Sequence, residues 1–296
     1  MAAANPGGQR STLLFGLACA FISASLYAIA TLSAALAYDA GSNPATVIWI
    51  RFLFSSLTLF LVAAALRRPL RPARRDWPAL LGIALGAFGT TNGYLTSVAF
   101  IPVSLAVLIF YTFPLLVGIA EPLLERRPIG ARMLTCSVLA FGGLALALGP
   151  SFETLDWRGI LLAAVASASG LIAFLSTRRL SARADSIGSS AITLALCFLA
   201  MCLVLPLTSR FALPTGTLGW LGLAAAAVLF MAAYFLQLLA LRLAPAGPVA
   251  LIFNVEPALT VVLAWLILST TLSLLQALGV GLVIAALVAA ASGRRR

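Results

Sequence analysis

Two ionisable side chains lie inside long apolar stretches of the sequence, where a charge is costly and an ionisable group is a candidate for function. Glu256 lies about ten residues into the stretch from Gly247 to Leu268, roughly 14 Å from one interface if the stretch is helical. Its carboxyl group could bind an amine or exchange a proton, or it could be a hydrogen-bonded structural group beside Pro257. Arg51 lies near the outer end of the stretch from Ala45 to Leu66, and we expect its long side chain either to snorkel to the headgroups or to make a structural contact.

Polar and aromatic side chains gather in the same apolar stretches. Tyr94 and Gln237 occupy equivalent positions of the internal repeat described below, and so do Tyr111 and Asn254. Two such pairs favour a shared central site in which rings give apolar contact and polar groups orient a substrate; hydrogen bonds between helices are the alternative explanation. The candidate substrate-binding residues are Tyr27, Asn92, Tyr94, Tyr111, Ser169, Tyr234, Gln237, Asn254 and Glu256.

Several kinds of chemistry lack the residues that they need. The chain contains neither histidine nor lysine, which removes the commonest metal ligand and the lysine of a nucleotide-binding loop. Its four cysteines lie in apolar stretches at spacings that match no metal or redox motif. Paired carboxylates for intramembrane hydrolysis are absent as well. We therefore expect no catalytic residue, no metal, no cofactor, no ATP-driven pump and no enzyme activity.

The elements that position these side chains are predicted to be transmembrane helices. Apolar residues make up 62% of the chain and charged residues 9%, a composition that excludes a water-soluble globule. Runs of about 20 apolar residues are long enough to span a bilayer, and lipid requires them to be helical. The ten runs are approximately Thr12 to Leu36, Ala45 to Leu66, Trp77 to Ala99, Val103 to Ala120, Gly130 to Leu148, Trp157 to Thr177, Ile187 to Pro206, Leu218 to Leu241, Gly247 to Leu268 and Leu272 to Ala291.

The second half of the sequence repeats the first. At an offset of 143 residues, Pro102, Leu108-Ile109-Phe110 and Pro114 match Pro245, Leu251-Ile252-Phe253 and Pro257 without a gap, which indicates an internal duplication. The fold class that follows is an all-α membrane protein with two five-helix repeats, residues 1–150 and 151–296. Because five is odd, the repeats would be inverted relative to each other around a central cavity, an arrangement typical of transporters.

Two prolines of the repeat lie within predicted spans. Pro114 and Pro257 each remove a backbone donor, and proline commonly bends a transmembrane helix at such a position. We therefore treat both as candidate hinges, with a fixed kink as the alternative.

The arginines predict the orientation of the chain. Nearly all of them fall on one side when the spans are numbered from an inside start, and by the positive-inside rule both termini are then cytoplasmic. The net charge of +11 is explained by topology and by contact with anionic lipid headgroups. We expect no nucleic-acid partner.

The sequence resembles the EamA-type drug/metabolite transporters. The residues that carry the resemblance are the Phe253-Asn-Val-Glu-Pro257 segment, Ala264-Trp265-Leu-Ile-Leu268, Leu272-Ser-Leu-Leu-Gln276-Ala-Leu-Gly279, Pro114 and the Glu125-Arg-Arg-Pro128 turn. Within that superfamily the chain is most similar to the YddG-type amino acid exporters. It departs from many relatives in having Ser269-Thr270 where they have Gly-Glu.

The resemblance implies a basket-like bundle with a central cavity lined by spans one, three, four, six, eight and nine. It also implies export of small metabolites without ATP. We expect a multi-pass protein of the bacterial cytoplasmic membrane that exports amino acids, including aromatic ones, and that functions as a monomer. The alternatives are an exporter of lipophilic drugs or other metabolites, and a non-transporting membrane accessory protein.

Overall fold

The computed structural model describes residues 6–150, 152, 155–180, 184–208, 211–268 and 273–292. In these residues the chain forms helices joined by short connections, and it forms no strand. The helices are α1 (Pro6–Asp39), α2 (Pro44–Ala65), the 3-10 turn η1 (Arg74–Asp76), α3 (Trp77–Ser97), α4 (Val103–Phe110), α5 (Phe113–Leu124), α6 (Ala131–Leu148), α7 (Trp157–Arg178), α8 (Ser186–Thr208), α9 (Gly216–Leu243), α10 (Ala246–Phe253), α11 (Val255–Leu268) and α12 (Leu274–Ser292). The Ser269-Thr270 turn lies outside the described residues.

Eight segments in the described part are long and apolar enough to cross a membrane, with α4 and α5 counted as one and α10 and α11 as another. The helix α12 contains a shorter apolar segment, Leu274–Ala290. The helix α3 is continuous, but the polar sequence from Gly89 to Gly93 lowers its apolar character, and α3 is not among the eight. The count of ten spans therefore stays a prediction for these two helices.

The outer surface of the bundle is apolar. Leu85, Leu203 and Leu207 expose 69, 74 and 85% of their surface, and many other large apolar side chains on the outside are similarly exposed. Such a surface is unfavourable in water and favourable against lipid tails. Together with the apolar lengths of the helices, it indicates a multi-pass membrane protein.

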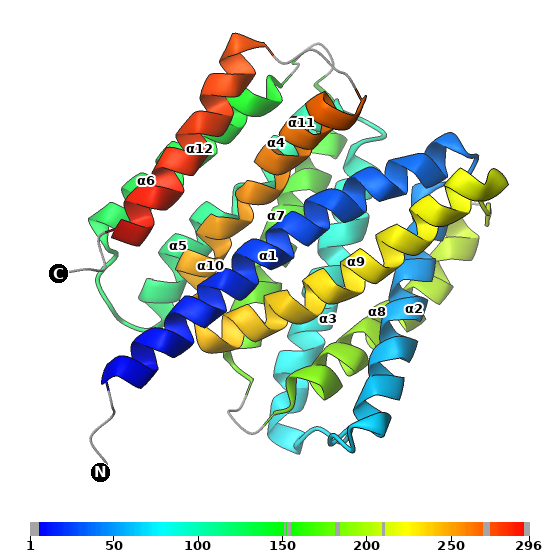
Figure 1. Ribbon diagram of the computed structural model, residues 1–296, viewed down its shortest axis with the longest axis horizontal. Helices are drawn as coiled ribbons and strands as arrows, with labels where there is room; N and C mark the ends of the chain where they lie inside the picture. The colour runs from blue at the N-terminus through cyan, green and yellow to red at the C-terminus, as the bar shows by residue number, and fades with distance from the viewer. Residues whose placement is uncertain are drawn as a thin grey trace.

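Helices from the two halves of the chain pack in pairs. α1 lies along α9, α3 along α7, α2 along α8 and α6 along α12 (Figure 1). Small residues permit the close approach. A Cβ on Gly86 of α3 would lie 2.6 Å from the carbonyl oxygen of Ser169 on α7, and a Cβ on Gly143 of α6 would lie 2.8 Å from that of Gly279 on α12. These pairs form the wall of the bundle around α4, α5, α10 and α11.

The two proline-containing spans are each broken into two helices. Pro114 is the second residue of α5 and Pro257 the third of α11. Proline has no N–H, so the carbonyls of Phe110 and Phe253 lack the helical donor four residues later. The backbone N–H groups of Thr112 and Asn254 bond instead to Ile109 and Leu251, three residues earlier. The breaks therefore lie one turn before the prolines, in the middle of the bundle.

Candidate functional site

A cavity of about 640 Å³ lies at the centre of the bundle, between α1, α2, α3, α4, α7, α9 and α11. It extends to Pro44 at the start of α2, Val98 after α3 and Val103 at the start of α4, all at one end of the bundle. We call this end the arginine-poor end. The opposite, arginine-rich end carries the α2–α3 and α7–α8 connections, which are joined by an ion pair between Arg68 and Asp185 (3.9 Å). The volume is within the usual range for ligand pockets.

Polar groups from four helices meet in the cavity. The Tyr27 hydroxyl of α1 donates to Oε1 of Gln237 on α9 at 2.8 Å. The Tyr111 hydroxyl, after α4, approaches the Glu256 carboxyl group in the first turn of α11. The Tyr234 hydroxyl of α9 is already used, because it donates to Oγ1 of Thr193 on α8 at 3.0 Å. The cavity therefore offers one carboxyl group, one side-chain amide and several phenols for binding.

Aromatic rings form the apolar part of the lining. Phe110 stacks on Phe113 with ring centroids 5.1 Å apart, and Phe113 lies 5.1 Å from Phe174 of α7. Phe174 contacts Phe253 of α10 edge-on at 5.4 Å, and Phe253 is 6.1 Å from Tyr27. Rings in these geometries stabilise one another. The rings next to both helix breaks are part of this lining, so the breaks shape the cavity.

Arg51 also lines the cavity, where it makes a structural contact in place of the snorkelling that the sequence equally allowed. Its guanidinium carbon lies 4.7 Å from the ring centroid of Phe230 on α9, within the range of a cation–π interaction. Its Nε atom is buried and has no hydrogen-bond partner among the described residues. The reason for the difference is that the inner face of α2 adjoins the cavity, so the side chain has a nearer polar space than the membrane interface.

The cavity unites six of the nine candidate substrate-binding residues. Tyr27, Tyr94, Tyr111, Tyr234, Gln237 and Glu256 line it, as does the candidate hinge Pro257. Pro114 does not line it and is buried in the first turn of α5.

The remaining three candidates lie outside the lining. The Asn92 amide donates to the Phe88 carbonyl of its own helix at 3.0 Å. Ser169 faces Gly89 at the crossing of α3 and α7. Asn254 is 2% exposed and donates to Leu251 at 2.9 Å. Asn92 and Ser169 are thus occupied by a local or interhelical contact, whereas the Oδ1 atom of Asn254 is buried without a hydrogen-bond partner among the described residues.

Some cavity residues were missed by the sequence reading. Tyr38, Thr90 and Thr91 also line the cavity. Thr90 and Thr91 belong to the same polar sequence of α3 as Asn92, which is the only one of the three among the predicted substrate-binding residues. Tyr38 was missed because it lies beyond the expected end of the first span, whereas α1 continues to Asp39.

A buried carboxylate lies at the arginine-rich end of the bundle, one residue beyond the predicted end of its span at Ala120. Glu121 of α5 is 7% exposed. Its two oxygens accept the backbone N–H groups of Ala246 and Gly247, at the start of α10, both at 2.6 Å. A carboxylate is favourable at a helix N-terminus because it satisfies donors that have no helical partner.

A second charged residue completes this contact. Nε of Arg178, in the last turn of α7, lies 3.5 Å from Oε1 of Glu121. Its Nη1 atom donates to the carbonyls of Leu241 and Ala244 at 3.2 and 3.3 Å. We call Glu121, Arg178 and the start of α10 the charged lock. It joins α5, α7, α9 and α10 across the bundle.

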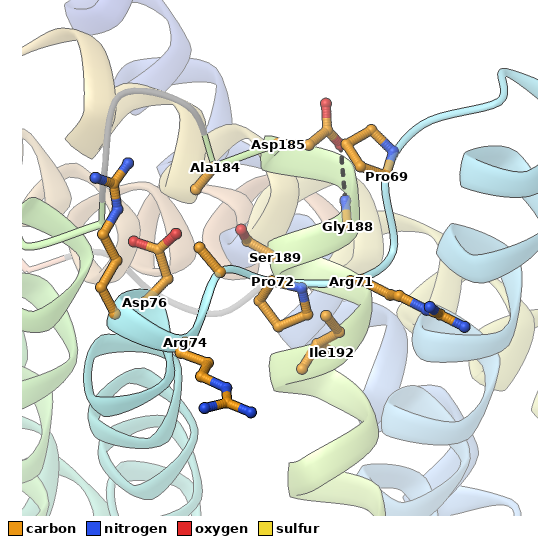
Figure 2. A pocket seen from close by; sticks show the side chains of 12 residues that line it. Pro69, Arg71, Pro72, Arg74, Asp76, Ala184, Asp185, Gly188, Ser189 and Ile192 are labelled. Atoms are coloured by element: carbon orange, nitrogen blue, oxygen red, sulfur yellow. Dashed lines mark hydrogen bonds between the residues drawn. The ribbon is translucent and has the colours of Figure 1, made fainter.

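A second hollow, of about 470 Å³, lies at the arginine-rich end between the α2–α3 connection and the start of α8 (Figure 2). It shares no lining residue with the central cavity. Figure 2 shows that Arg71 and Arg74 point away from each other, and that Asp185 accepts the Gly188 N–H (2.9 Å) and so caps α8. The hollow is thus built from a connection and a helix cap.

Known proteins resemble the chain over most of its length. The sequence profile of the EamA-like transporter family matches residues 14–149 and, separately, residues 157–291. The threonine/homoserine exporter RhtA of Escherichia coli (strain K12) is 31% identical over 241 residues, which are 77% of this chain and 76% of that protein. RhtA of Salmonella typhimurium (strain LT2) is 28% identical over 239 residues, with the same coverage.

A solved crystal structure supports the fold. It superposes with a TM-score of 0.81 at 20% sequence identity, over 97% of this chain and 99% of the other. The family profile spans both halves of the sequence, and the names of the relatives are those of bacterial transporters. With its apolar helices, the chain is a multi-pass protein of the bacterial inner membrane, and it belongs to the EamA-like transporter family.

Proposed function

We propose that this protein exports small metabolites, with amino acids as the favoured class, by alternating access and without ATP. The observation that carries the proposal is the central cavity, which combines polar groups and aromatic rings and reaches the arginine-poor end of the bundle at Pro44, Val98 and Val103. A cavity that is open at one end and locked at the other has the form expected of one conformation of an alternating-access transporter. The names of the RhtA relatives support amino acids as substrates.

The pairing of the helices supports two inverted repeats, residues 1–150 and 151–296. At the offset of 143 residues α1 corresponds to α7 and α3 to α9, so the packing of α1 on α9 corresponds to that of α7 on α3. By the same offset, the α2–α8 and α6–α12 pairs each join a helix to its own counterpart. Contacts that come in equivalent sets are what a two-fold axis in the membrane plane produces.

The orientation follows from the arginines. The positive-inside rule makes the arginine-rich end cytoplasmic, with both termini on that side. The cavity then extends toward the outside, and the charged lock closes the cytoplasmic end. Export would require the lock to open and the outer end to close, with the helix breaks before Pro114 and Pro257 as the points that bend.

In this mechanism the substrate lies among residues of both halves. Glu256, Gln237 and the Tyr27 and Tyr111 hydroxyls orient its polar groups, and the phenylalanine rings contact its apolar part. The same rings make a lipophilic drug the second candidate substrate, because they provide a largely apolar surface. The protein functions as a monomer in this proposal, since one chain contains the whole cavity.

The test is transport of labelled L-threonine by the purified protein in proteoliposomes, with and without a proton gradient, in wild type and Glu256→Gln. We expect transport above that of protein-free liposomes. Transport that requires the gradient and is lost in Glu256→Gln would make Glu256 the coupling acid, whereas gradient-independent transport that survives the change would indicate facilitated export. Absence of transport for threonine and for a panel of other amino acids would reject amino acid export and favour lipophilic substrates or an accessory role.

A further inference from the structure

The central cavity contains a cation and a carboxyl group that are not paired with each other. Arg51 of α2 and Glu256 of α11 both line it. Neither takes part in a salt bridge within the part of the chain that the structure describes. The Nε–H of Arg51 is buried there without an acceptor, and its guanidinium lies over the face of the Phe230 ring.

Unpaired ionisable groups inside a membrane protein destabilise the fold unless something else compensates them. Two residues of opposite charge that line the same cavity could have formed a buried ion pair, as Glu121 and Arg178 do at the arginine-rich end. Arg51 and Glu256 instead line the cavity without a salt bridge to each other in the described part of the chain. The compensating charges are therefore expected to come from a ligand with one group of each sign.

On the basis of the proposed export of amino acids, we propose that Arg51 binds the carboxylate and Glu256 the ammonium group of a zwitterionic α-amino acid. The planar guanidinium donates two parallel hydrogen bonds to a carboxylate, and a carboxylate accepts from an ammonium group. A zwitterion satisfies both protein charges and adds no net charge to the cavity. The Tyr111 hydroxyl, which approaches Glu256, holds that carboxyl group in place.

In this assignment the charged residues and the aromatic rings of the cavity recognise different parts of the substrate. The two charged residues bind the groups that all α-amino acids share, and the side chain of the substrate falls against the aromatic rings. Among these, Phe230 lies under Arg51, and Phe253 lies in the helix turn before Glu256. The protein should therefore accept several amino acids and reject compounds that lack either charged group.

The experiment measures inhibition of labelled L-threonine transport in proteoliposomes by three unlabelled compounds. These are L-threonine, the amino alcohol threoninol, which lacks the carboxylate, and 2,3-dihydroxybutyrate, which lacks the ammonium group. For wild type we expect each incomplete analogue to inhibit about tenfold to a hundredfold more weakly than threonine, the loss expected for one charged hydrogen-bonded contact.

Variants of the two residues then test which side chain binds the carboxylate and which binds the ammonium group of the substrate. Arg51→Gln should weaken threonine inhibition but leave that of threoninol unchanged, and Glu256→Gln should weaken threonine but leave that of 2,3-dihydroxybutyrate unchanged. Arg51→Lys, which keeps the charge, should retain part of the preference for the carboxylate. Arg10→Gln and Glu125→Gln, which change exposed residues at the arginine-rich end, are the matched controls and should behave as wild type. Where a variant transports too slowly for inhibition to be measured, binding is read from the ligand-induced shift of thermal unfolding in detergent.

The proposal is overturned if wild type binds threoninol as tightly as threonine. It is also overturned if Arg51→Gln weakens threonine and threoninol equally while the protein still unfolds cooperatively, because Arg51 would then act through the fold. In either case transport of threonine by wild type would leave the export function standing. If wild type neither binds nor transports any amino acid, the proposed function itself is wrong, and this assignment is wrong with it.

Discussion

The crossing of α5 with α10 and the crossing of α4 with α11 are equivalent in the repeat but differ in packing. α5 packs closely against α10, and Glu121 joins them through the backbone of Ala246 and Gly247. α4 and α11 make no comparable contact among the described residues, and the cavity separates them, with Val107 and Thr260 on its walls. The same duplicated sequence thus forms one closed and one open crossing.

The chemical basis of the difference is visible in the sequence. The counterpart of Glu121 at the offset of 143 residues is Ala264, and that of Arg178 is Ala35. The open crossing therefore has no charged lock of its own. A lock at only one end would favour the conformation observed here, and its removal should raise the population of the opposite one.

The largest effect is expected from Glu121→Gln. The glutamine side chain cannot form the ion pair with Arg178. Its NH2 group is a donor where one carboxylate oxygen was an acceptor, so one of the two backbone N–H groups at the start of α10 loses its acceptor. Loss of charge-assisted hydrogen bonds worth about 1.5–3 kcal/mol each should shift the equilibrium at least about tenfold toward opening at the arginine-rich end.

The measurement is the rate at which an impermeant thiol reagent modifies Thr177→Cys, at the deep end of the cavity, in a cysteine-free background. With the reagent on the arginine-rich side, labelling should be faster in Glu121→Gln than in wild type. Glu125→Gln, on the same helix end but exposed and paired with Arg127, is the control. Equal labelling in all three proteins would show that Glu121 does not close this end.

The open crossing is tested by cross-linking across the cavity. Cysteines in place of Val107 on α4 and Thr260 on α11 should cross-link slowly, because the cavity lies between them. Adding Glu121→Gln should accelerate the reaction, since closure of this crossing accompanies opening of the other. A rate that is unaffected by the lock would mean that the two crossings move independently.

A smaller effect is expected from Gly247→Ala. The added Cβ would lie 3.3 Å from Oε2 of Glu121, so the carboxylate must move by a few tenths of an ångström. We expect about 1 kcal/mol of lost stability in the closed crossing, at the lower end of the cost of overpacking. Accessibility of Thr177→Cys should rise less than in Glu121→Gln, and Gly142→Ala, whose Cβ would meet nothing within 4 Å, should leave it unchanged.

The smallest effect concerns the arginine-poor end, outside the membrane-spanning helices. Asp156 caps α7 through the Arg158 N–H at 2.9 Å, and hydrogen bonds from the Arg158 side chain and backbone lower the pKa of its carboxyl group. Because the folded pKa is depressed, any stabilisation is complete above the unfolded value of about 4 and is lost as the pH falls through the folded pKa. Asp156→Ala should lower the melting temperature slightly at pH 7, and the difference from wild type should shrink as the pH falls below about 4; transport at pH 7 should be unchanged.

Much of the fold could be predicted from the sequence, because lipid imposes apolar helices of a fixed length. The positions of Pro114 and Pro257 also indicated where the spans are interrupted, although each span forms two helices and not one bent helix. The finer expectation of a YddG-type exporter stays a prediction, as do the roles of the candidate substrate-binding residues.

The side-chain directions were harder to predict. Arg51 looked like an interfacial arginine because the sequence gives its depth and not the face of α2 on which it lies. Glu121 looked like the first charge beyond a span, and only packing against the start of α10 gives it a buried partner. Asn92 and Asn254 are polar residues of the expected kind, but their amides bond to their own helices. In all four cases the role of the side chain depends on the residues that it contacts in the fold. These residues are either distant in the sequence or one helical turn away.

The most direct test of alternating access is double electron–electron resonance between spin labels that report both crossings. One pair is at Leu124 on α5 and Leu243 just before α10; the other is at Val103 on α4 and Leu266 on α11. On addition of saturating L-threonine we predict reciprocal changes, with a longer-distance population in the first pair and a shorter-distance one in the second. Changes of the same sign in both pairs, or a change in only one, would contradict the account.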